Sequence, residues 1–126
     1  MSLLKIQFFG LLVVLSTSLS ANTIENKVNV IADIQRGQLL WKKSYKGIPP
    51  YEQRSCQSCH GKDLSQVGHH IKTKRVIKAM APSVNSQRFS NPRKVAKWFL
   101  RNCKWTMGKE CTVQEKADIL AYLKSL

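Results

Sequence analysis

Apolar residues recur at helical spacing near the start of the chain. Over residues 30–45, Ile34 and Trp41 lie seven positions apart, with Gly37 between them. Positions seven apart share one face of a helix. A glycine inside a helix costs about 1 kcal/mol relative to alanine, so its presence often marks close packing. The pattern predicts a first helix over residues 30–45.

Two further helices are predicted in the second half of the chain. Asn91 can cap a helix that has Pro92 at its first position and continues to Arg101, because proline lacks the N–H that this position leaves unbonded. Thr112 and Glu115 form the three-residue spacing of a capping box, which starts the last helix. The apolar stripe of that helix comprises Val113, Ala117, Leu120 and Leu123, with Ile119 and Tyr122 beside it.

The remaining sequence carries weaker signals. Residues 62–90 are ambiguous, and we expect at most a short helical piece over residues 71–80. No segment alternates apolar and polar residues with the period of two that a half-buried strand requires. The predicted fold class is therefore all-α, in one small domain.

The N-terminus has the pattern of a secretory signal peptide. Lys5 precedes an apolar run, Ile6–Leu15, and a stretch of small and polar residues then ends at Ala21. The apolar run is short for a membrane span, which needs about 20 residues. We expect residues 1–21 to be cleaved, which leaves residues 22–126 as one periplasmic domain without a permanent membrane anchor.

The chain is strongly basic. It has 21 Lys and Arg against 7 Asp and Glu, a formal net charge of +14, which falls to +13 when Lys5 is removed with the signal peptide. Export argues against a nucleic-acid partner. The charge favours either a surface kept soluble by repulsion or attraction to an acidic partner or membrane face.

One motif carries specific chemistry. Cys56, Cys59 and His60 form the Cys-x-x-Cys-His sequence by which a chain attaches haem c. The two thiols add to the haem vinyl groups, and the histidine supplies an iron ligand. A zinc site would need further ligands such as Cys103 and Cys111, and a thioredoxin-like redox pair would need a βαβ context. We therefore predict one covalently bound haem c with His60 on the iron, which makes residues 22–126 a cytochrome c domain.

With this motif, the helix pattern resembles class I cytochromes c. In that family the N- and C-terminal helices cross with aromatic residues at the seam. The resemblance implies that Gly37 and Trp41 face Ile119 and Tyr122.

The second axial ligand decides the function. In electron-transfer cytochromes c it is usually methionine, and Met80 and Met107 are the candidates, although methionine is also an ordinary core filler. His69 and His70, which we interpret as loop residues, are weaker candidates, and a vacant position is a further alternative.

Asn102 is a less ordinary candidate. It follows Val95, Trp98 and Phe99 at helical spacing, which predicts that it lies on the apolar face of its helix. A buried amide needs a partner, and haem iron can be that partner. The alternative is that Asn102 caps the C-terminus of the helix.

From Ser55 to the C-terminus, the chain resembles the sphaeroides haem protein (SHP) family of high-spin class I cytochromes c. The matching runs are Ser55-Cys56, Cys59-His60-Gly61, Ala81-Pro82-Ser83, Arg88-Phe89, Lys97-Trp98, Arg101-Asn102-Cys103, Gly108–Cys111 and Glu115-Lys116-Ala117-Asp118.

The resemblance implies specific roles. In the family, the asparagine of the Arg-Asn-Cys run ligates the iron and the next cysteine joins a cysteine eight residues on, which corresponds here to Asn102, Cys103 and Cys111. The haem motif leaves only this one of the three pairings that four cysteines allow. Met80 departs from the family pattern and keeps methionine ligation open.

The implied function combines two activities. The protein would accept electrons from a redox partner, for which the family suggests a dihaem cytochrome c, and acidic groups on that partner would suit the basic chain. Reduction would release Asn102 and open the iron to dioxygen, nitric oxide or carbon monoxide. The alternatives are a His/Met electron carrier and a small enzyme that acts on oxygen, nitric oxide or peroxide.

Overall fold

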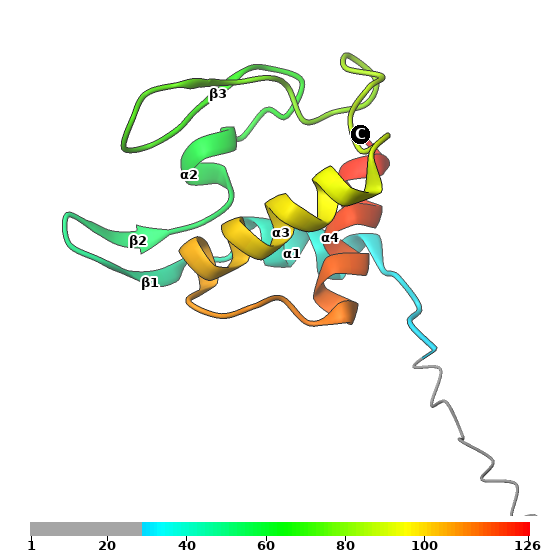
Figure 1. Ribbon diagram of the computed structural model, residues 1–126, viewed down its shortest axis with the longest axis horizontal. Helices are drawn as coiled ribbons and strands as arrows, with labels where there is room; N and C mark the ends of the chain where they lie inside the picture. Colours follow the sequence, from blue (N-terminus) through cyan, green and yellow to red (C-terminus); the bar gives the residue numbers. More distant parts are fainter. Residues whose placement is uncertain (1–28) are drawn as a thin grey trace, which may run out of the picture.

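The computed structural model describes residues 29–126, so the predicted signal peptide lies outside the described residues. Figure 1 shows the elements in chain order: α1 (Ile34–Lys42), β1 (Tyr45–Ile48), β2 (Tyr51–Arg54), α2 (Gln57–His60), β3 (Gly68–His69), β4 (Val76–Ile77), α3 (Pro92–Met107) and α4 (Val113–Lys124). None of the helices in this part of the chain is long and apolar enough to cross a membrane.

The predicted helical fold class is confirmed, and the structure adds two small hairpins. Strands β1 and β2 pair antiparallel with Tyr45 opposite Arg54, and β3 pairs antiparallel with β4 with Gly68 opposite Ile77. The helical piece expected over residues 71–80 is wrong. Residues 76–77 form β4 instead, after a turn in which Lys74 has a φ of 59°.

The predicted seam between the first and last helices is confirmed. A Cβ atom on Gly37 would overlap the backbone carbonyl of Asp118 and approach Cβ of Tyr122 to 2.9 Å, so α1 and α4 touch where only glycine fits. The ring centroids of Trp41 and Tyr122 lie 6.5 Å apart at the same crossing.

Capping residues set the helix boundaries. Asp33 accepts a hydrogen bond from the Arg36 N–H at 2.7 Å, so α1 begins at Ile34 and is shorter than the predicted 30–45. Asn91 caps α3 through the Lys94 N–H at 3.0 Å, as predicted. The predicted capping box also forms, with the Glu115 N–H donating to Thr112 Oγ1 at 3.1 Å and the Thr112 N–H donating to the Glu115 carboxylate at 2.8 Å.

The end of α3 differs most from the expectation. The helix runs six residues past Arg101 and ends at Met107. Gly108 then adopts a left-handed conformation, with φ of 73°, which terminates the helix.

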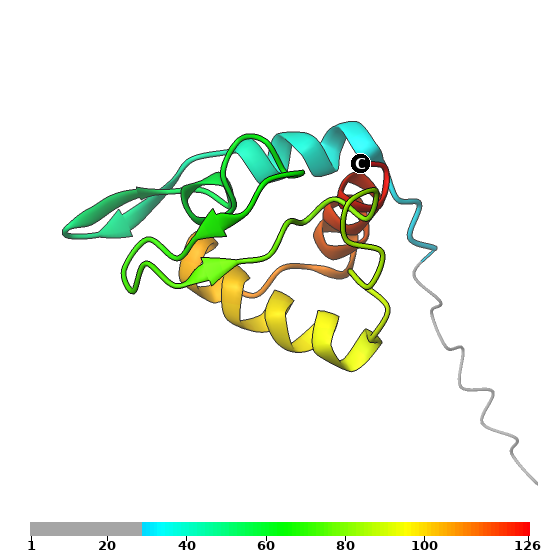
Figure 2. The same ribbon diagram turned by 90° about the horizontal axis from the view of Figure 1, so that it is seen from above.

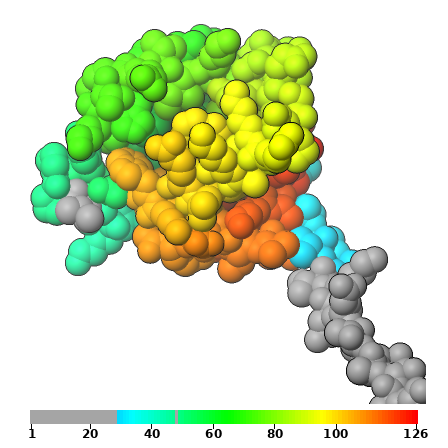
Figure 3. All heavy atoms as spheres, viewed as in Figure 1, coloured from blue at the N-terminus to red at the C-terminus, as the bar shows by residue number. Residues whose placement is uncertain are grey.

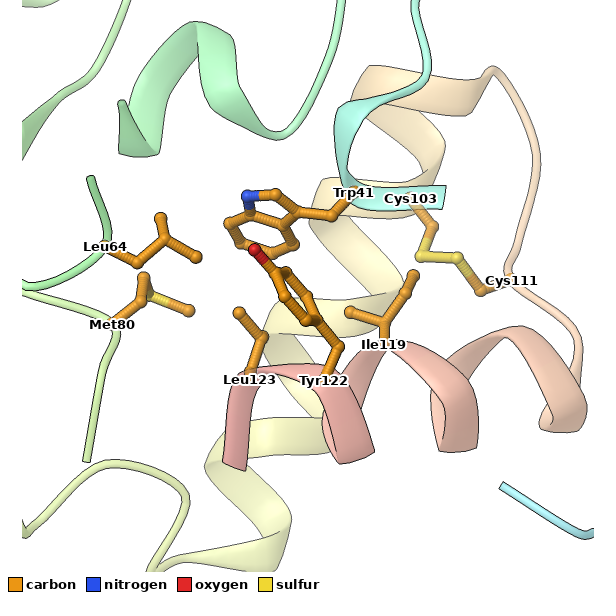
Figure 4. Packing of buried hydrophobic residues seen from close by; sticks show 8 residues of the cluster. All are labelled: Trp41, Leu64, Met80, Cys103, Cys111, Ile119, Tyr122 and Leu123. Atoms are coloured by element: carbon orange, nitrogen blue, oxygen red, sulfur yellow. A yellow bond between two sulfur atoms is a disulfide. The ribbon is translucent and has the colours of Figure 1, made fainter. Parts of the chain in front are cut away.

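The core lies between α1, α4, the C-terminal part of α3 and the segments that carry Leu64 and Met80 (Figure 4). Its buried members are Trp41, Leu64, Met80, Cys103, Cys111, Ile119, Tyr122 and Leu123. A disulfide joins Cys103 of α3 to Cys111, with Cα atoms 5.6 Å apart, so it ties the end of α3 to the start of α4. This is the pairing that the family resemblance implies.

Asp118 is a buried carboxylate on α4, with 2% of its surface exposed. It accepts hydrogen bonds from the Asp33 N–H at 2.7 Å, from Arg36 Nε at 2.9 Å and from Gln114 Nε2 at 2.8 Å. The Arg36 guanidinium holds the pKa of this carboxyl down at about 2. Asp118 therefore joins the start of α1 to α4 as an anion.

The haem motif lies between the first and third helices. In Figure 2, α1 and α3 lie on opposite sides of the molecule, and α2 and the β3–β4 hairpin lie between them. The β1–β2 hairpin projects from the end of the molecule at which α3 terminates.

Candidate functional site

Helix α2 is a single turn that displays the haem motif. Cys56 caps it, the His60 N–H donates to the Cys56 carbonyl at 3.1 Å, and Gly61 ends it with φ of 76°, a conformation that favours glycine. Residues three apart share a helix face. The turn thus places Cys56 and Cys59 together with His60 adjacent.

The β3–β4 hairpin supports this turn from one side. A Cβ on Gly68 would overlap the Cys59 carbonyl and lie 2.8 Å from Cα of His60, so the hairpin packs directly on the motif. The Ile71 N–H points at Cys59 Sγ at 3.4 Å. A thioether sulfur remains a weak acceptor, so this contact is compatible with haem attachment.

His60 lies in an apolar setting. Its ring centroid is 5.2 Å from that of Trp41, and its Nδ1 is buried without a hydrogen-bond partner among the described residues. Burial, followed by the charge of Arg88, lowers the pKa of His60 to about 4. The imidazole is therefore neutral at physiological pH, which is the form that ligates a metal.

The cysteine chemistry argues against the two alternatives to haem. Burial raises the pKa of Cys56 to about 12, whereas a reactive redox cysteine needs a lowered thiol pKa. Cys103 and Cys111 are joined to each other and are not available to zinc. Over residues 29–126, no three His, Cys, Asp or Glu side chains are grouped as a metal site.

The structure corrects both expectations for Asn102. Because α3 continues to Met107, Asn102 lies inside the helix and is not its C-terminal cap. Its side chain is also exposed, so it does not point into the protein core as the helical phase predicted. The core side of α3 is instead formed by Cys103 and Thr106, which are buried.

Asn102 belongs to a partly apolar face of α3 that the protein itself does not cover. Trp98, one turn earlier, is 45% exposed, and Val95 is half-buried. Exposure of a tryptophan side chain to water is unfavourable. A porphyrin would cover the indole ring, and the neighbouring amide could then reach the iron. The residues of α2 and α3 therefore fit a haem.

Both methionine candidates lie in or against the core. Met80 is 9% exposed and belongs to the buried cluster, and its N–H donates to the Leu64 carbonyl at 2.9 Å. Figure 4 shows its side chain beside Leu64. Met107 is partly buried, with its sulfur 3.3 Å from that of Cys111. These positions favour the core-filler interpretation for both.

The prediction that the two histidines after the motif are loop residues is confirmed for His70 and wrong for His69. His69 is exposed in β3. His70 follows it, and its Nδ1 accepts hydrogen bonds from the N–H groups of Lys72 and Thr73 at 3.3 and 3.1 Å. These bonds shape the turn of the hairpin, which gives His70 a structural role.

Sequence reasoning missed a second group beside the motif. The Arg54 guanidinium lies over the Trp105 ring, 4.2 Å from its centroid, and Nη1 donates to the Trp105 carbonyl at 2.7 Å. The hydroxyl of Tyr45, which pairs across the hairpin with Arg54, is buried without a partner in the described residues, as is Arg54 Nε. The two hairpin residues are distant from Trp105 in sequence, so no local pattern reveals the group.

Comparisons with known proteins agree with this geometry. Residues 27–123 match a family described as a domain of unknown function (DUF1924). The chain is 40% identical over 92 residues to the cytochrome c-type protein SHP of Cereibacter sphaeroides, covering 73% of this chain and 70% of that one. It is 34% identical over 90 residues to cytochrome c'' of Methylophilus methylotrophus, covering 71% and 62%.

Two solved structures are similar to about three quarters of the chain. Oxidised SHP, described as an oxygen-binding cytochrome c, matches with a TM-score of 0.69 and 38% identity, over 75% of this chain and 83% of that one. Oxidised cytochrome c'' from Methylophilus methylotrophus matches with a TM-score of 0.64 and 33% identity, over 73% and 74%. A solution structure of the latter protein addresses the structural basis of haem-ligand detachment.

Proposed function

The chain belongs to the SHP family and is an electron-transfer cytochrome with one covalently bound haem c, and we propose that it also binds a diatomic ligand at a site controlled by Asn102. Cys56 and Cys59 would form the two thioether bonds, and His60 and Asn102 would ligate the iron. When bound, haem supplies a one-electron couple and an iron site for a small ligand.

One observation carries the proposal. Asn102 stands on the exposed, tryptophan-bearing face of α3, whereas Met80 is buried in the core. A methionine that already fills the core would have to leave it to ligate the iron, which would open a cavity. Asn102 needs no such rearrangement.

The chemistry of the amide explains the coupling of two activities. An amide oxygen is a hard, weak-field ligand that suits ferric iron better than ferrous iron. On reduction Asn102 would leave the iron, and its N–H₂ group would then be free to donate a hydrogen bond to an incoming dioxygen, nitric oxide or carbon monoxide. The relatives support the two parts of this proposal separately, since one is described as oxygen-binding and the structure of another addresses haem-ligand detachment.

The proposed location is the periplasm. It rests on the signal-peptide pattern of residues 1–21. It also rests on the use of the cysteines, because in an oxidising compartment cysteines persist as disulfides or as cofactor attachments and not as free thiols. The donor would be an exported redox protein with an acidic surface, and the family resemblance favours a dihaem cytochrome c.

Absorption spectra of the oxidised and reduced protein, with and without carbon monoxide, test the proposal. We expect a high-spin ferric spectrum and ready binding of carbon monoxide after reduction. Asn102→Ala should keep the haem covalently attached, change the ferric spectrum and ease the entry of external ligands such as imidazole.

Met80→Leu is the matched control, because leucine keeps the volume of the side chain and removes only the sulfur. It should leave both spectra unchanged. A silent Asn102→Ala change, together with a Met80→Leu change that converts a low-spin haem to high-spin, would instead establish a His/Met electron carrier.

A further inference from the structure

A groove of about 370 Å³ lies next to the haem motif and is not part of the proposed iron site. Its lining residues are Pro49, Pro50, Tyr51, Arg54, Lys72 and Trp105. They come from three elements: the β1–β2 hairpin, the turn after β3 and the end of α3. Figure 3 shows these elements meeting on one face, with the hairpins in teal and green and the end of α3 in orange.

The cations in the groove are only partly satisfied. Arg54 uses Nη1 to bond the Trp105 carbonyl, and its Nε is buried with no partner among the described residues. Lys72 is exposed and forms no ion pair within residues 29–126. The remaining Nη2 group of Arg54 forms no hydrogen bond within residues 29–126, and a guanidinium N–H group of this kind suits a carboxylate.

The surroundings of the groove are basic. The two hairpin segments, residues 45–54 and 68–77, contain five Lys and Arg and one acidic residue, Glu52, which gives a net charge of +4. The cations are Lys46, Arg54, Lys72, Lys74 and Arg75. Such a cluster attracts an acidic surface and guides its approach.

The groove also adjoins the cofactor attachment. Arg54 is two residues from Cys56, and Ile71, the neighbour of Lys72, contacts Cys59 Sγ at 3.4 Å. A partner seated here would therefore lie against the segment that holds the haem, where electrons enter or leave most directly.

We propose that this groove is the docking site for the acidic redox partner, and that it receives a Glu or Asp carboxylate of that partner between Arg54, Lys72 and Trp105. The inference rests on the proposed electron-transfer function but not on the identity of the second axial ligand. Tyr51, whose ring centroid is 6.5 Å from that of Trp105, would close the apolar side of the groove around the carboxylate stem.

Titration of the isotope-labelled holoprotein with an acetylated, amidated tetraglutamate peptide tests the site. The protein is used reduced and under carbon monoxide, where it is diamagnetic with either candidate ligand. At low ionic strength we expect the largest NMR shifts at the Trp105 indole N–H and the Arg54 Nε–H. Lys72→Glu should weaken binding about tenfold, because an attraction becomes a repulsion.

Lys94→Glu is the matched control. It makes the same change in net charge at an exposed position in the first turn of α3, roughly 16 Å along the helix from Trp105, and should weaken binding less than twofold. Equal weakening by both variants, or shifts centred elsewhere, would overturn the docking site. So would an NOE between Arg54 and a haem propionate, since the cofactor would then fill the groove.

Mass and absorption spectra of each variant separate this test from the proposed function. Lys72→Glu should retain one covalent haem and an unchanged spectrum. A loss of binding with the haem intact then reports on the docking site alone.

Discussion

The α1–α4 crossing and the α2–α3 side of the molecule differ in how closely they are packed and in how well their polar groups are hydrogen-bonded. At the crossing, Gly37 leaves no space between the helices, and the buried charge of Asp118 is fully hydrogen-bonded. On the α2–α3 side, Trp98 is 45% exposed.

The unpaired polar groups show the same contrast. Four buried side-chain polar atoms lack a hydrogen-bond partner within residues 29–126: Trp41 Nε1, Tyr45 Oη, Arg54 Nε and His60 Nδ1. All belong to α2, to the hairpin before it or to the tryptophan that contacts His60. Unpaired buried polar groups are costly. Three of the four groups therefore lie where the cofactor and partner would bind, and the fourth, Trp41 Nε1, belongs to the crossing at the point where it contacts His60.

The largest expected effect tests the binding side directly. Replacing both Cys56 and Cys59 with alanine should abolish covalent haem, because no other thiols stand beside His60. Mass spectrometry of the denatured exported protein measures the result. Replacing both Cys103 and Cys111 with alanine is the control, and it should remove the disulfide but keep the haem mass; loss of haem from this control would contradict the separation of the two cysteine pairs.

The next largest effect tests the crossing. Gly37→Ala would push a methyl group into the Asp118 carbonyl, at a cost of about 3 kcal/mol for overpacking, offset by about 1 kcal/mol of helix propensity. We expect the free energy of unfolding to fall by about 2 kcal/mol in a denaturant titration. Gln35→Ala, an exposed site on the same helix, should change it by less than about 0.5 kcal/mol. A stable Gly37→Ala protein would mean that the crossing is loose.

Acid should weaken the crossing through Asp118. Because hydrogen bonds from Arg36 lower the pKa of this carboxyl from 3.8 to about 2, its contribution to stability is present above pH 3.8 and is lost as the pH falls through 2. At pH 5 the free energy of unfolding of the wild-type protein should exceed that of Asp118→Asn, and this difference should disappear as the pH is lowered to 2. If the difference in free energy of unfolding stayed constant with pH, Asp118 would stabilise the crossing by the fit of its side chain and not by its charge.

The crossing could be predicted from the sequence because its signals are local. The Gly37–Trp41 spacing and the cap at Thr112 each lie within one helix, where periodicity is informative. The predicted stripe of the last helix was wrong at its start, because Val113 is 64% exposed and the buried face consists of Asp118, Ile119, Tyr122 and Leu123. Asp118 was missed as a structural centre, because its partners Asp33 and Arg36 lie more than 80 residues away. Its position next to Ile119, which the sequence pattern placed beside the apolar stripe, was the one hint of burial.

The binding side was predicted less completely. The haem motif could be predicted because its residues are contiguous in the sequence. The strands were missed because two to four residues are too few to show an alternating pattern. The Arg54–Trp105 contact joins residues 51 positions apart. For Asn102, helical phase gave the correct face relative to Trp98 but not its exposure, which depends on how far the rest of the protein covers α3.

The smallest expected effect on stability belongs to Asn102, and it distinguishes the two regions most sharply. In the reduced protein, where we propose that Asn102 has left the iron, its side chain no longer has a bond to lose, and it is not part of the protein core. Asn102→Ala should therefore change the free energy of unfolding by less than about 0.5 kcal/mol, although it alters the ferric spectrum. Ser86→Ala, at another exposed position, provides a control for an ordinary surface change. A loss of about 2 kcal/mol or more in the reduced protein would place Asn102 among the structural residues and would remove the division between a stable crossing and an adaptable binding face.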